Sequence, residues 1–528
     1  AYRIFGVSET VQTYLIVEAL EKALEDGADI INLSLGGEIQ RKLLWLTGYR
    51  AQRQGTILVA AVGNDGPDLG TIYIPASIPS YIGVGSATSP WSDALLCKAS
   101  AGTYALHTAR PMNNSALGKV EGEVINVKHG RVQDVVDLDL EGKIALSFRD
   151  RKTYFGEMEY NVASKGAVGL IVVNDEDASF NGALVHPDLP DYNPRIPTIS
   201  VAKFEGEEIL SRGTVQFEVF RSEGKPYPSM FSSRGTIDPL KIKPDLLAYG
   251  ENVPAMTLHG VKLVSGTSMA TPQVAAAIAL LFEKTGKLSF KETLSALMLS
   301  SIPLDGYPGY VQGAGLLNIT KLLEVPFIMD PPYMMIYSWP DHKGSGFLSI
   351  SFFGQPKEVK WSGPLEVEEL LYREFMIKGD IDGYYYMKVE TDGFVGNYPV
   401  KVVEADFGLE ATNKRIYAIG VPDGTKVKVS VTFPSGDIEE YEGEAPVIAE
   451  FQPYEEGLYL FEGYSANGTA YLRKEFPGTN VQVSNPPPYM PIYMAAFVWA
   501  YSIVVMIFRF RNRARREVYS SSRVRASS

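Results

Sequence analysis

Residues 8–64 alternate between two hydrophobic patterns, and this alternation limits the folds open to the chain more than any other feature. Apolar side chains recur at helical spacing over residues 11–24 and again over residues 38–53. Each helical stretch is followed by a short apolar run, at residues 30–35 and 57–62, that ends in glycine. Apolar strands that alternate with helices are typical of an α/β fold with a parallel sheet covered on both faces.

Functional sites in such sheets lie beyond the carboxyl ends of the strands. Those ends are predicted at residues 34–36 and at residues 63–64, which are small or polar. We therefore expect these two segments to lie side by side at one edge of the sheet and to border a site.

A second feature is the run G-T-S-M-A-T-P at residues 266–272, which leads into an alanine-rich helical stretch. Pro272 is expected in the first turn of that helix, where proline is tolerated. Ser268 would then lie at a helix N-terminus, where unpaired N–H groups and the helix dipole favour negative charge. This position suits a serine nucleophile whose attack creates an oxyanion. From this residue alone, a plain helix N-cap is the simpler interpretation.

The composition bounds the class of protein. The chain has 528 residues, 45% of them hydrophobic and 21% charged, which is too long for one compact domain and enough for roughly three. A formal net charge of -13 argues against a nucleic-acid-binding surface. The single cysteine, Cys97, excludes an internal disulfide. With five histidines and no C-x-x-C or H-E-x-x-H spacing, the sequence predicts no metal site.

The C-terminal end of the chain has the pattern of a membrane anchor. Residues 489–508 are twenty residues without a charge, enough for about 30 Å of helix. A proline-rich linker, residues 482–488, precedes them. Residues 509–528 hold seven Arg and one Glu, so the positive-inside rule predicts a cytoplasmic tail and an ectodomain at residues 1–488. The other interpretation, a buried core helix, is disfavoured by the Arg-rich chain end.

Two further regions are rich in short predicted strands. Residues 102–220 show them together with one helix near residues 156–165. Residues 326–481 are rich in Tyr, Val and turn glycines, a pattern typical of an all-β, sandwich-like module.

The run at residues 266–272 resembles the nucleophile signature of the subtilisin-like serine proteases, or subtilases. Further blocks resemble this family in the right chain order: residues 29–36, 60–66, 231–235, 243–245 and 312–318. The resemblance covers about residues 1–101 and 221–325. It implies a subtilisin-like parallel sheet with helices on both faces.

The resemblance also implies roles for single residues. Ser268 would be the nucleophile, and Asn64 would donate its side-chain amide to the oxyanion together with the Ser268 backbone N–H. The primary specificity pocket would be lined by the two strand ends, that is by Ser34, Leu35 and Gly36 and by Ala61, Val62 and Gly63. The alternative for Asn64 is a turn residue before Asp65 and Gly66, which the neighbouring motifs disfavour.

Residues 140–146 and 163–174 resemble a protease-associated (PA) domain. The resemblance implies an insertion that covers the active-site cleft and binds or gates peptide substrates; the alternative is a passive insert. The expected domains are a first catalytic part at residues 1–101, the PA-like insertion at 102–220, a second catalytic part at 221–325 and the sandwich-like module at 326–481.

Two parts of the subtilase pattern are absent from this sequence. The family orders its triad Asp, His and Ser, because the His accepts the serine proton and the Asp orients the His. No D-[ST]-G or H-G-T-H-like block precedes the segment at residues 34–36. The nearest histidine by sequence, His259, is expected in a hairpin turn and is a poor replacement base. We therefore expect the natural protein to have an upstream part with an export signal, the Asp and the His.

The sequence thus predicts a membrane-anchored serine endopeptidase that hydrolyses extracellular proteins, with residues 1–528 alone inactive. Two alternatives stay open: a non-catalytic surface protein that binds peptides on a subtilase and PA scaffold, and an adhesion protein that uses its β module. Proteins or peptides are the expected partners, and nucleic acid is not. No cofactor is assigned; calcium is common in the family, but no ligand loop can be named. The low cysteine content favours a prokaryotic cell surface.

Overall fold

The computed structural model describes residues 1–5, 11–37, 41–236, 242–257, 260–355, 357–371 and 373–476. By its internal contacts the chain divides into a large unit, Ala1–Phe451 with Leu458–Lys474, and a small unit, Gln452–Gly457 with Glu475–Ser528. All residues of the candidate site belong to the large unit.

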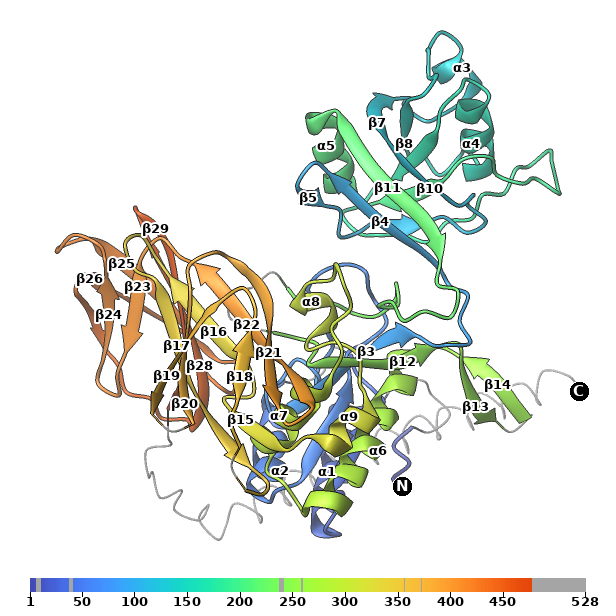
Figure 1. The fold of residues 1–528 in the computed structure, drawn as a ribbon. Coiled ribbons are helices and arrows are strands. Elements are labelled where there is room, and N and C mark those ends of the chain that lie inside the picture. The colour runs from blue at the N-terminus through green and yellow to red at the C-terminus, as the bar shows by residue number, and fades with distance from the viewer. Residues whose placement is uncertain are drawn as a thin grey trace, which may run out of the picture. The chain divides into compact units, whose positions relative to one another are not determined.

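A four-stranded parallel sheet forms the centre of the N-terminal region (Figure 1). Its strand order is β1-β2-β3-β12, and every neighbouring pair is parallel. The strands are β1 (Ile30–Leu33), β2 (Ile57–Ala61), β3 (Tyr81–Thr88) and β12 (Leu246–Glu251). The helices of this region are α1 (Thr13–Glu25), α2 (Arg41–Arg53), α6 (Thr267–Thr285), α7 (Phe290–Ser300), α8 (Gly309–Gln312) and α9 (Ile319–Glu324). The predicted parallel sheet is confirmed.

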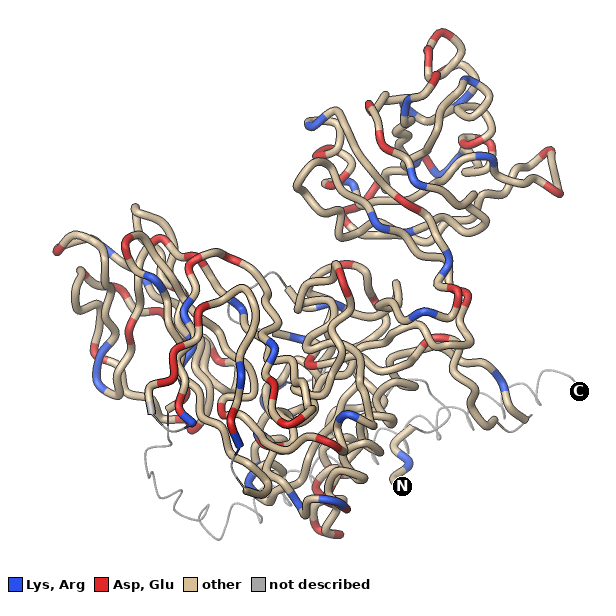
Figure 2. Tube along the Cα trace, in the orientation of Figure 1, with Lys and Arg blue, Asp and Glu red and all other residues tan. Residues whose placement is uncertain are grey.

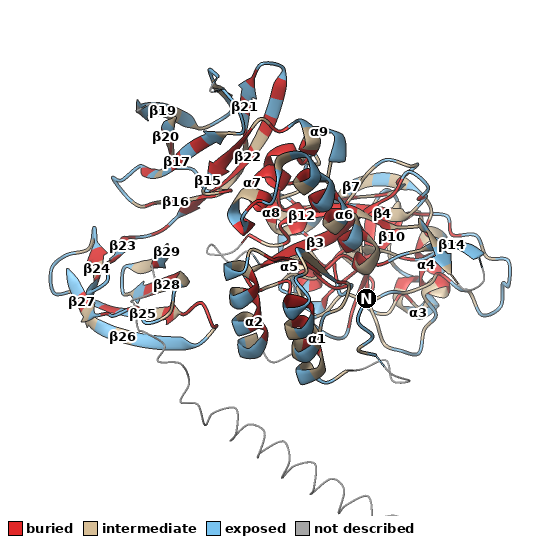
Figure 3. Ribbon diagram, turned by 90° about the horizontal axis from the view of Figure 1, so that it is seen from below, coloured by how far each residue is buried: buried red, intermediate tan, exposed pale blue. Residues whose placement is uncertain are grey.

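Strand β2 shows why this sheet needs helices on both faces. All five of its residues are buried, and successive side chains point to opposite faces. Ile57 and Val59 belong to the core that includes buried residues of α6 and α7. Leu58 and Ala60 belong to a second core with buried residues of α1 and α2. In Figure 3 the buried residues of α1 and α2 lie on their sheet-facing sides, and their other sides are exposed.

The expected insertion is built on an eight-stranded sheet of order β5-β4-β11-β7-β8-β9-β10-β6. Its strands are β4 (Leu95–Ala101), β5 (Tyr104–Ala105), β6 (Arg110–Pro111), β7 (Gly118–Asn126), β8 (Ile144–Phe148), β9 (Gly169–Val173), β10 (Thr198–Val201) and β11 (Thr214–Arg221). Its helices are α3 (Val132–Val135), α4 (Phe155–Ala163) and α5 (Lys203–Arg212). The sheet begins at Leu95, ahead of the predicted boundary at residue 102, because β4 pairs antiparallel with β11 from Leu95 opposite Arg221.

A separate two-stranded ribbon precedes the helix that carries Ser268. It pairs β13 (Val253–Thr257) with β14 (Gly260–Val264) in antiparallel register. A hairpin was expected here, and its two strands are present. His259 itself lies outside the described residues.

The region expected as one sandwich-like module contains two sets of strands. In the first set, two four-stranded sheets share one core that includes Ile350 and Ile377 of one sheet and Val389 and Val400 of the other. Their strands are β15 (Phe327–Asp330), β17 (Gly344–Phe352), β20 (Glu374–Gly379) and β19 (Glu366–Leu371), and β16 (Met334–Ser338), β22 (Phe394–Glu404), β21 (Gly383–Thr391) and β18 (Lys360–Ser362).

The second set is a single seven-stranded sheet of order β23-β24-β27-β26-β25-β28-β29. Its strands are β23 (Gly408–Ala411), β24 (Arg415–Ile419), β25 (Lys426–Thr432), β26 (Ile438–Glu444), β27 (Val447–Glu450), β28 (Gly457–Ser465) and β29 (Gly468–Phe476). The two sets share no strand pairing among the described residues. The hydrophobic pattern of a sequence indicates strands but not which strands pair in one sheet. The division of this region into two sets was therefore not predicted from the sequence.

Acidic and basic residues are interspersed along the strands of these sheets (Figure 2). Cross-strand ion pairs use them, such as Lys378 with Glu368 at 2.7 Å and Lys428 with Glu440 at 2.8 Å. Exposed pairs of this kind each contribute about 0–1 kcal/mol, so the surface charge serves solubility more than stability.

In the part of the chain that the structure describes, no helix combines the length and the apolar character needed to cross a membrane. The predicted linker at residues 482–488, span at 489–508 and tail at 509–528 lie outside that part.

The two-faced core predicts a contrast between two leucine substitutions. Leu58 of β2 is 1% exposed, whereas Leu46 of α2 is 48% exposed. Leu58→Ala should lower the free energy of unfolding by about 2–5 kcal/mol, because it leaves a cavity between sheet and helices. Leu46→Ala should cost less than about 1 kcal/mol. The free energy of unfolding of each variant can be measured by hydrogen exchange of the β2 amides in increasing urea. Equal losses in the two variants would contradict the assignment of Leu58 to a buried core.

Candidate active site

The candidate site is formed where two adjacent parallel strands end and α6 begins. Ser34 follows β1 directly, and Asn64 follows β2 after two residues. Gly266 is the N-cap of α6, so Ser268 is its second helical residue. The sequence predicted that these three segments would meet, and the structure brings Ser34, Asn64 and Ser268 together through the hydrogen bonds described next.

Ser34 and Ser268 are joined by two reciprocal hydrogen bonds. The Ser268 hydroxyl donates to the Ser34 carbonyl oxygen at 3.1 Å, and the Ser34 hydroxyl donates to the Ser268 carbonyl oxygen at 3.0 Å. The Asn32 side-chain amide donates to the Ser34 hydroxyl at 3.0 Å and so helps to fix its rotamer. Ser268 is half-buried, and these bonds hold its hydroxyl in one place.

The second of these bonds depends on a proline. Pro272 was expected in the first turn of the helix, but α6 begins at Thr267, so Pro272 is its sixth residue. In an α-helix the N–H of residue 272 would bond to the carbonyl of residue 268, and proline has no N–H. The Ser268 carbonyl is therefore left without its helical donor, and the Ser34 hydroxyl takes that place.

The side chain of Asn64 is oriented by Thr267. Its Oδ1 accepts from the Thr267 backbone N–H at 2.9 Å and from the Thr267 hydroxyl at 3.1 Å. A backbone N–H can only donate, so the Asn64 atom that faces it must be the oxygen. The amide nitrogen of Asn64 then points elsewhere, and Asn64 is exposed.

Two N–H donors flank the same small space. A Cβ atom placed on Gly266 would lie 3.8 Å from Asn64 Nδ2, 3.8 Å from the Ser268 backbone nitrogen and 3.9 Å from Asn64 Oδ1, which the Thr267 donors already occupy. The Ser268 nitrogen is one of the first four in α6 and has no helical acceptor. Two N–H groups beside a serine hydroxyl are the geometry that stabilises an oxyanion. Sequence reasoning named Asn64 and Ser268; it missed Thr267, although Thr267 lies inside the motif.

The loop after Asn64 is held from two sides. On the catalytic side, the Gly66 N–H donates to the Phe231 carbonyl at 2.9 Å, and the Asp65 N–H donates to the Ser233 hydroxyl at 3.1 Å. These partners belong to the F-S-S-R-G block at residues 231–235. That block therefore supports the donor loop and does not touch Ser268 through any bond recorded among the described residues.

The insertion holds the same loop from its other side. Arg110 donates to the Gly66 carbonyl, and the Ser179 N–H donates to the Asp68 carboxylate at 3.0 Å. The Arg110 guanidinium is oriented by the Ser179 hydroxyl at 2.9 Å, and burial lowers its pKa while Asp68 raises it. The inserted sheet thus contacts the segment that carries the amide donor.

The primary-pocket residues predicted from the resemblance lie in two segments, 34–36 and 61–63, that leave the ends of β1 and β2. Ala61, Val62 and Gly63 are buried, whereas Gly36 is exposed and Ser34 and Leu35 are half-buried. The ring of Tyr73 lies against both segments: it approaches Gly36 and Gly63 closely. Sequence reasoning missed Tyr73, because only the folded chain brings it to this place.

Other candidate groups lie away from Ser268. Burial raises the pKa of the Cys97 thiol to about 12, so this cysteine is no nucleophile.

The described histidines also lie away from Ser268. Burial, together with the Arg234 charge, lowers the pKa of His107. The four described histidines contact other groups: His107 meets Tyr310, His129 the Phe148 carbonyl, His186 Tyr160, and His342 Trp339. The described residues hold no cluster of His, Cys, Asp or Glu that could bind a metal ion.

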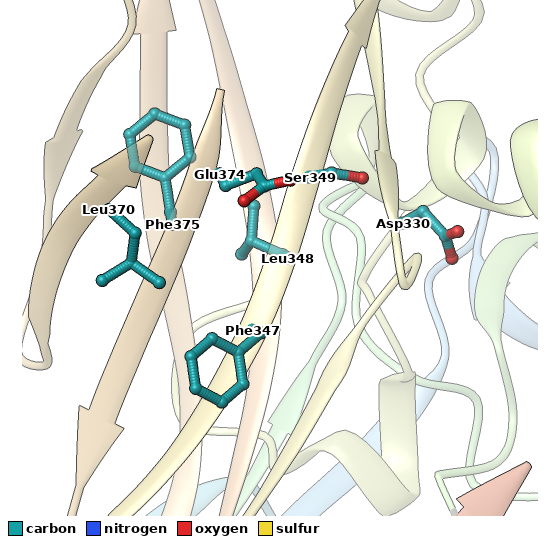
Figure 4. Close-up of a pocket in the computed structure, with 7 residues that line it drawn as sticks. All are labelled: Asp330, Phe347, Leu348, Ser349, Leu370, Glu374 and Phe375. Atoms are coloured by element: carbon teal, nitrogen blue, oxygen red, sulfur yellow. The ribbon is translucent and has the colours of Figure 1, made fainter. Parts of the chain in front are cut away.

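A shallow hollow of about 400 Å³ lies on the sheet of β15, β17, β19 and β20 (Figure 4). Its lining combines apolar side chains with two carboxylates and one hydroxyl, and comprises Asp330, Phe347, Leu348, Ser349, Leu370, Glu374 and Phe375. This lining offers no histidine, cysteine or lysine to activate the hydroxyl, so it does not compete with the Ser268 site.

Known proteins resemble this chain over more than half of its length. The minor extracellular protease Vpr of Bacillus subtilis (strain 168) is 28% identical over 358 residues, 63% of this chain and 43% of that protein. The subtilisin-like protease SBT3.16 of Arabidopsis thaliana is 28% identical over 380 residues, 62% of this chain and 46% of that protein. The chain thus spans less than half the length of these two curated relatives.

Among solved structures, a psychrophilic subtilisin-like protease of Pseudoalteromonas sp. AS-11 aligns over 58% of this chain and 72% of its own, with 17% identity and a TM-score of 0.25. That score is too low to carry an argument. The model of the subtilase family, in contrast, matches residues 1–319, which is more than half of the chain. The chain therefore belongs to the subtilase family of peptidases.

Proposed function

We propose that this protein is a serine endopeptidase of the subtilase type, with Ser268 as nucleophile and Asn64 as oxyanion donor. One observation carries the proposal: at the start of α6 the Asn64 side chain is bonded to Thr267, beside Ser268, and a Cβ atom on Gly266 would lie 3.8 Å from both Asn64 Nδ2 and the Ser268 nitrogen. Membership of the subtilase family supports the same assignment.

The reaction follows from this arrangement. Ser268 Oγ bonds to the carbonyl carbon of the scissile peptide, and its proton passes to a base. The carbonyl oxygen becomes negative and accepts hydrogen bonds from the Ser268 N–H and the Asn64 amide. The C–N bond then breaks, the leaving amine takes the proton, and water hydrolyses the acyl-enzyme by the same steps in reverse order.

The base is the component that the described residues do not supply near Ser268. The recorded partner of the Ser268 hydroxyl is the Ser34 carbonyl, which cannot take up its proton. We infer that the Asp and His of the triad come from polypeptide that is not in this sequence. Residues 1–528 alone should then hydrolyse peptides at the background rate.

The setting of the enzyme is part of the proposal. Residues 489–508 would anchor the protein in a cell membrane, with the catalytic region outside and residues 509–528 in the cytoplasm. The insertion would act as a PA-like domain that gates peptide substrates, because Arg110 and Ser179 contact the loop after Asn64. The substrates would be extracellular proteins.

A second candidate function is peptide binding without cleavage. It is favoured by the resting contact of the Ser268 hydroxyl with a carbonyl and by the absence of any described histidine in contact with it. Such a protein would bind extended peptides at the ends of β1 and β2 and would show no turnover in its natural form.

Replacing the nucleophile separates the two functions. In the natural gene product, Ser268→Ala should remove nearly all hydrolysis of a chromogenic peptide, because the variant has no hydroxyl at this position to attack the scissile carbonyl. Ser265→Ala is the matched control: Ser265 lies three residues earlier, is exposed and accepts only a backbone N–H in the recorded contacts. Equal turnover of the Ser268→Ala variant and the native protein would point to another nucleophile.

The orientation of Asn64 gives an independent prediction. Thr267→Val keeps the side-chain shape but removes the hydroxyl that donates to Asn64 Oδ1, so the amide donor should become less well placed. Turnover should fall by about 10-fold, less than the 10²–10³-fold known for loss of the whole donor in subtilisin, the reference case. Steady-state kinetics on the natural gene product measures this fall in kcat. The Michaelis constant should change little.

Thr271→Val is the control for this variant. The Thr271 hydroxyl donates to the Thr267 carbonyl at 2.8 Å and is buried, so its loss removes one hydrogen bond, about 1 kcal/mol of stability, whereas the Thr267 hydroxyl also bonds to the Gly63 backbone at 3.3 Å. It has no recorded contact with Asn64. If both variants lose turnover equally, Thr267 acts through general stability and not through Asn64.

A further inference from the structure

One aromatic ring, that of Tyr73, lies close to both strand-end segments, residues 34–36 and 61–63. A Cβ atom placed on Gly36 would lie 2.9 Å from Tyr73 Cβ and 3.1 Å from Tyr73 Cδ2. A Cβ atom placed on Gly63 would lie 2.7 Å from the same Cδ2 atom. The ring therefore lies against two glycines, one from each segment, and neither position could accept a side chain without a shift.

Three contacts hold Tyr73 in this place. Its backbone N–H donates to the Val62 carbonyl at 2.8 Å, and the next residue, Ile74, accepts from the Gly37 N–H at 3.2 Å. The Tyr73 hydroxyl donates to the Asp65 carboxylate. The backbone of residues 73–74 is thus tied to both segments, and the far end of the ring is tied to the loop after Asn64.

We propose that the Tyr73 ring fills most of the primary specificity pocket, so that the enzyme accepts only a small side chain on the residue before the scissile bond. The inference rests on the proposed function and specifies its substrates: peptides with Ala, Gly or Ser at this position, called P1. A close-packed region cannot take up an extra ring-sized group unless side chains move and lose several of their packing contacts. Phe, Leu or Lys at P1 would require the Tyr73 ring to leave both glycines and Asp65.

The Tyr73 ring also prevents the pocket from recognising the charge of a P1 side chain. The Asp65 carboxylate is the charged group beside the pocket, and the Tyr73 hydroxyl already donates to it. A basic P1 side chain would have to pass the ring to reach this carboxylate. The pocket therefore selects by size and not by charge.

The test compares peptides that differ only at P1. On the natural gene product, kcat/KM for the Ala peptide should exceed kcat/KM for the Phe peptide by about 10-fold or more, the scale that pocket size supplies. Tyr73→Gly should raise kcat/KM for the Phe peptide by about 10-fold or more and thus remove or reverse the preference. Tyr73→Phe keeps the ring without the hydroxyl and should retain the preference for Ala.

A native enzyme that cleaves after Phe as well as after Ala would overturn the inference, as would an unchanged ratio in Tyr73→Gly. The native ratio is informative by itself if that variant does not fold. Failure of the proposed function has a different signature, namely no Ser268-dependent cleavage of either peptide.

Binding distinguishes the two failures without catalysis. Fluorescent tetrapeptides that end in Ala or Phe can be titrated into residues 1–528, because such product peptides occupy the pocket without reacting. The Ala peptide should bind at least several-fold more tightly, and Tyr73→Gly should strengthen binding of the Phe peptide. Equal binding of the two peptides by the native chain would overturn the pocket assignment whether or not the protein is a protease.

Discussion

The pair of hydrogen bonds between Ser34 and Ser268 is the interaction on which the candidate site depends. One of the two bonds, from the Ser34 hydroxyl to the Ser268 carbonyl, is possible because Pro272 has no N–H to donate, which leaves that acceptor open in the first turn of α6. A helix that would otherwise only pack under the sheet is thereby tied to the end of β1. Ser268, the proposed nucleophile, is thereby held relative to the end of β1.

The rest of the site extends from this attachment. Thr267, beside Ser268, ties α6 to the end of β2 by directing the Asn64 oxygen towards the helix and its nitrogen away from it. Because β1 and β2 are adjacent and parallel, and β2 is buried along its whole length, the two attachments are held firmly with respect to each other. Tyr73 then lies between the two strand ends. One scaffold thus positions the proposed nucleophile Ser268, the proposed oxyanion donor Asn64 and the proposed pocket residue Tyr73.

Local patterns in the sequence predicted the parts that local physics controls. Apolar periodicity placed β1, β2 and the helices around them, and the parallel-sheet rule placed Ser34 and Asn64 at one edge. Three features depend on tertiary contacts, which local patterns do not predict. They are the role of Pro272, the support that Thr267 gives to Asn64, and the approach of Tyr73 to two distant glycines. The early start of the insertion also depends on a long-range pairing, that of β4 with β11.

The most direct measurement is a crystal structure of the natural gene product treated with a peptide boronic acid that ends in the alanine analogue. We expect boron bonded to Ser268 Oγ, with one boronate oxygen about 2.7–3.1 Å from both Asn64 Nδ2 and the Ser268 nitrogen. The Ser268 hydroxyl would have left the Ser34 carbonyl. A boronate bound elsewhere, or one on Ser268 whose oxygens both avoid Asn64, would contradict the account.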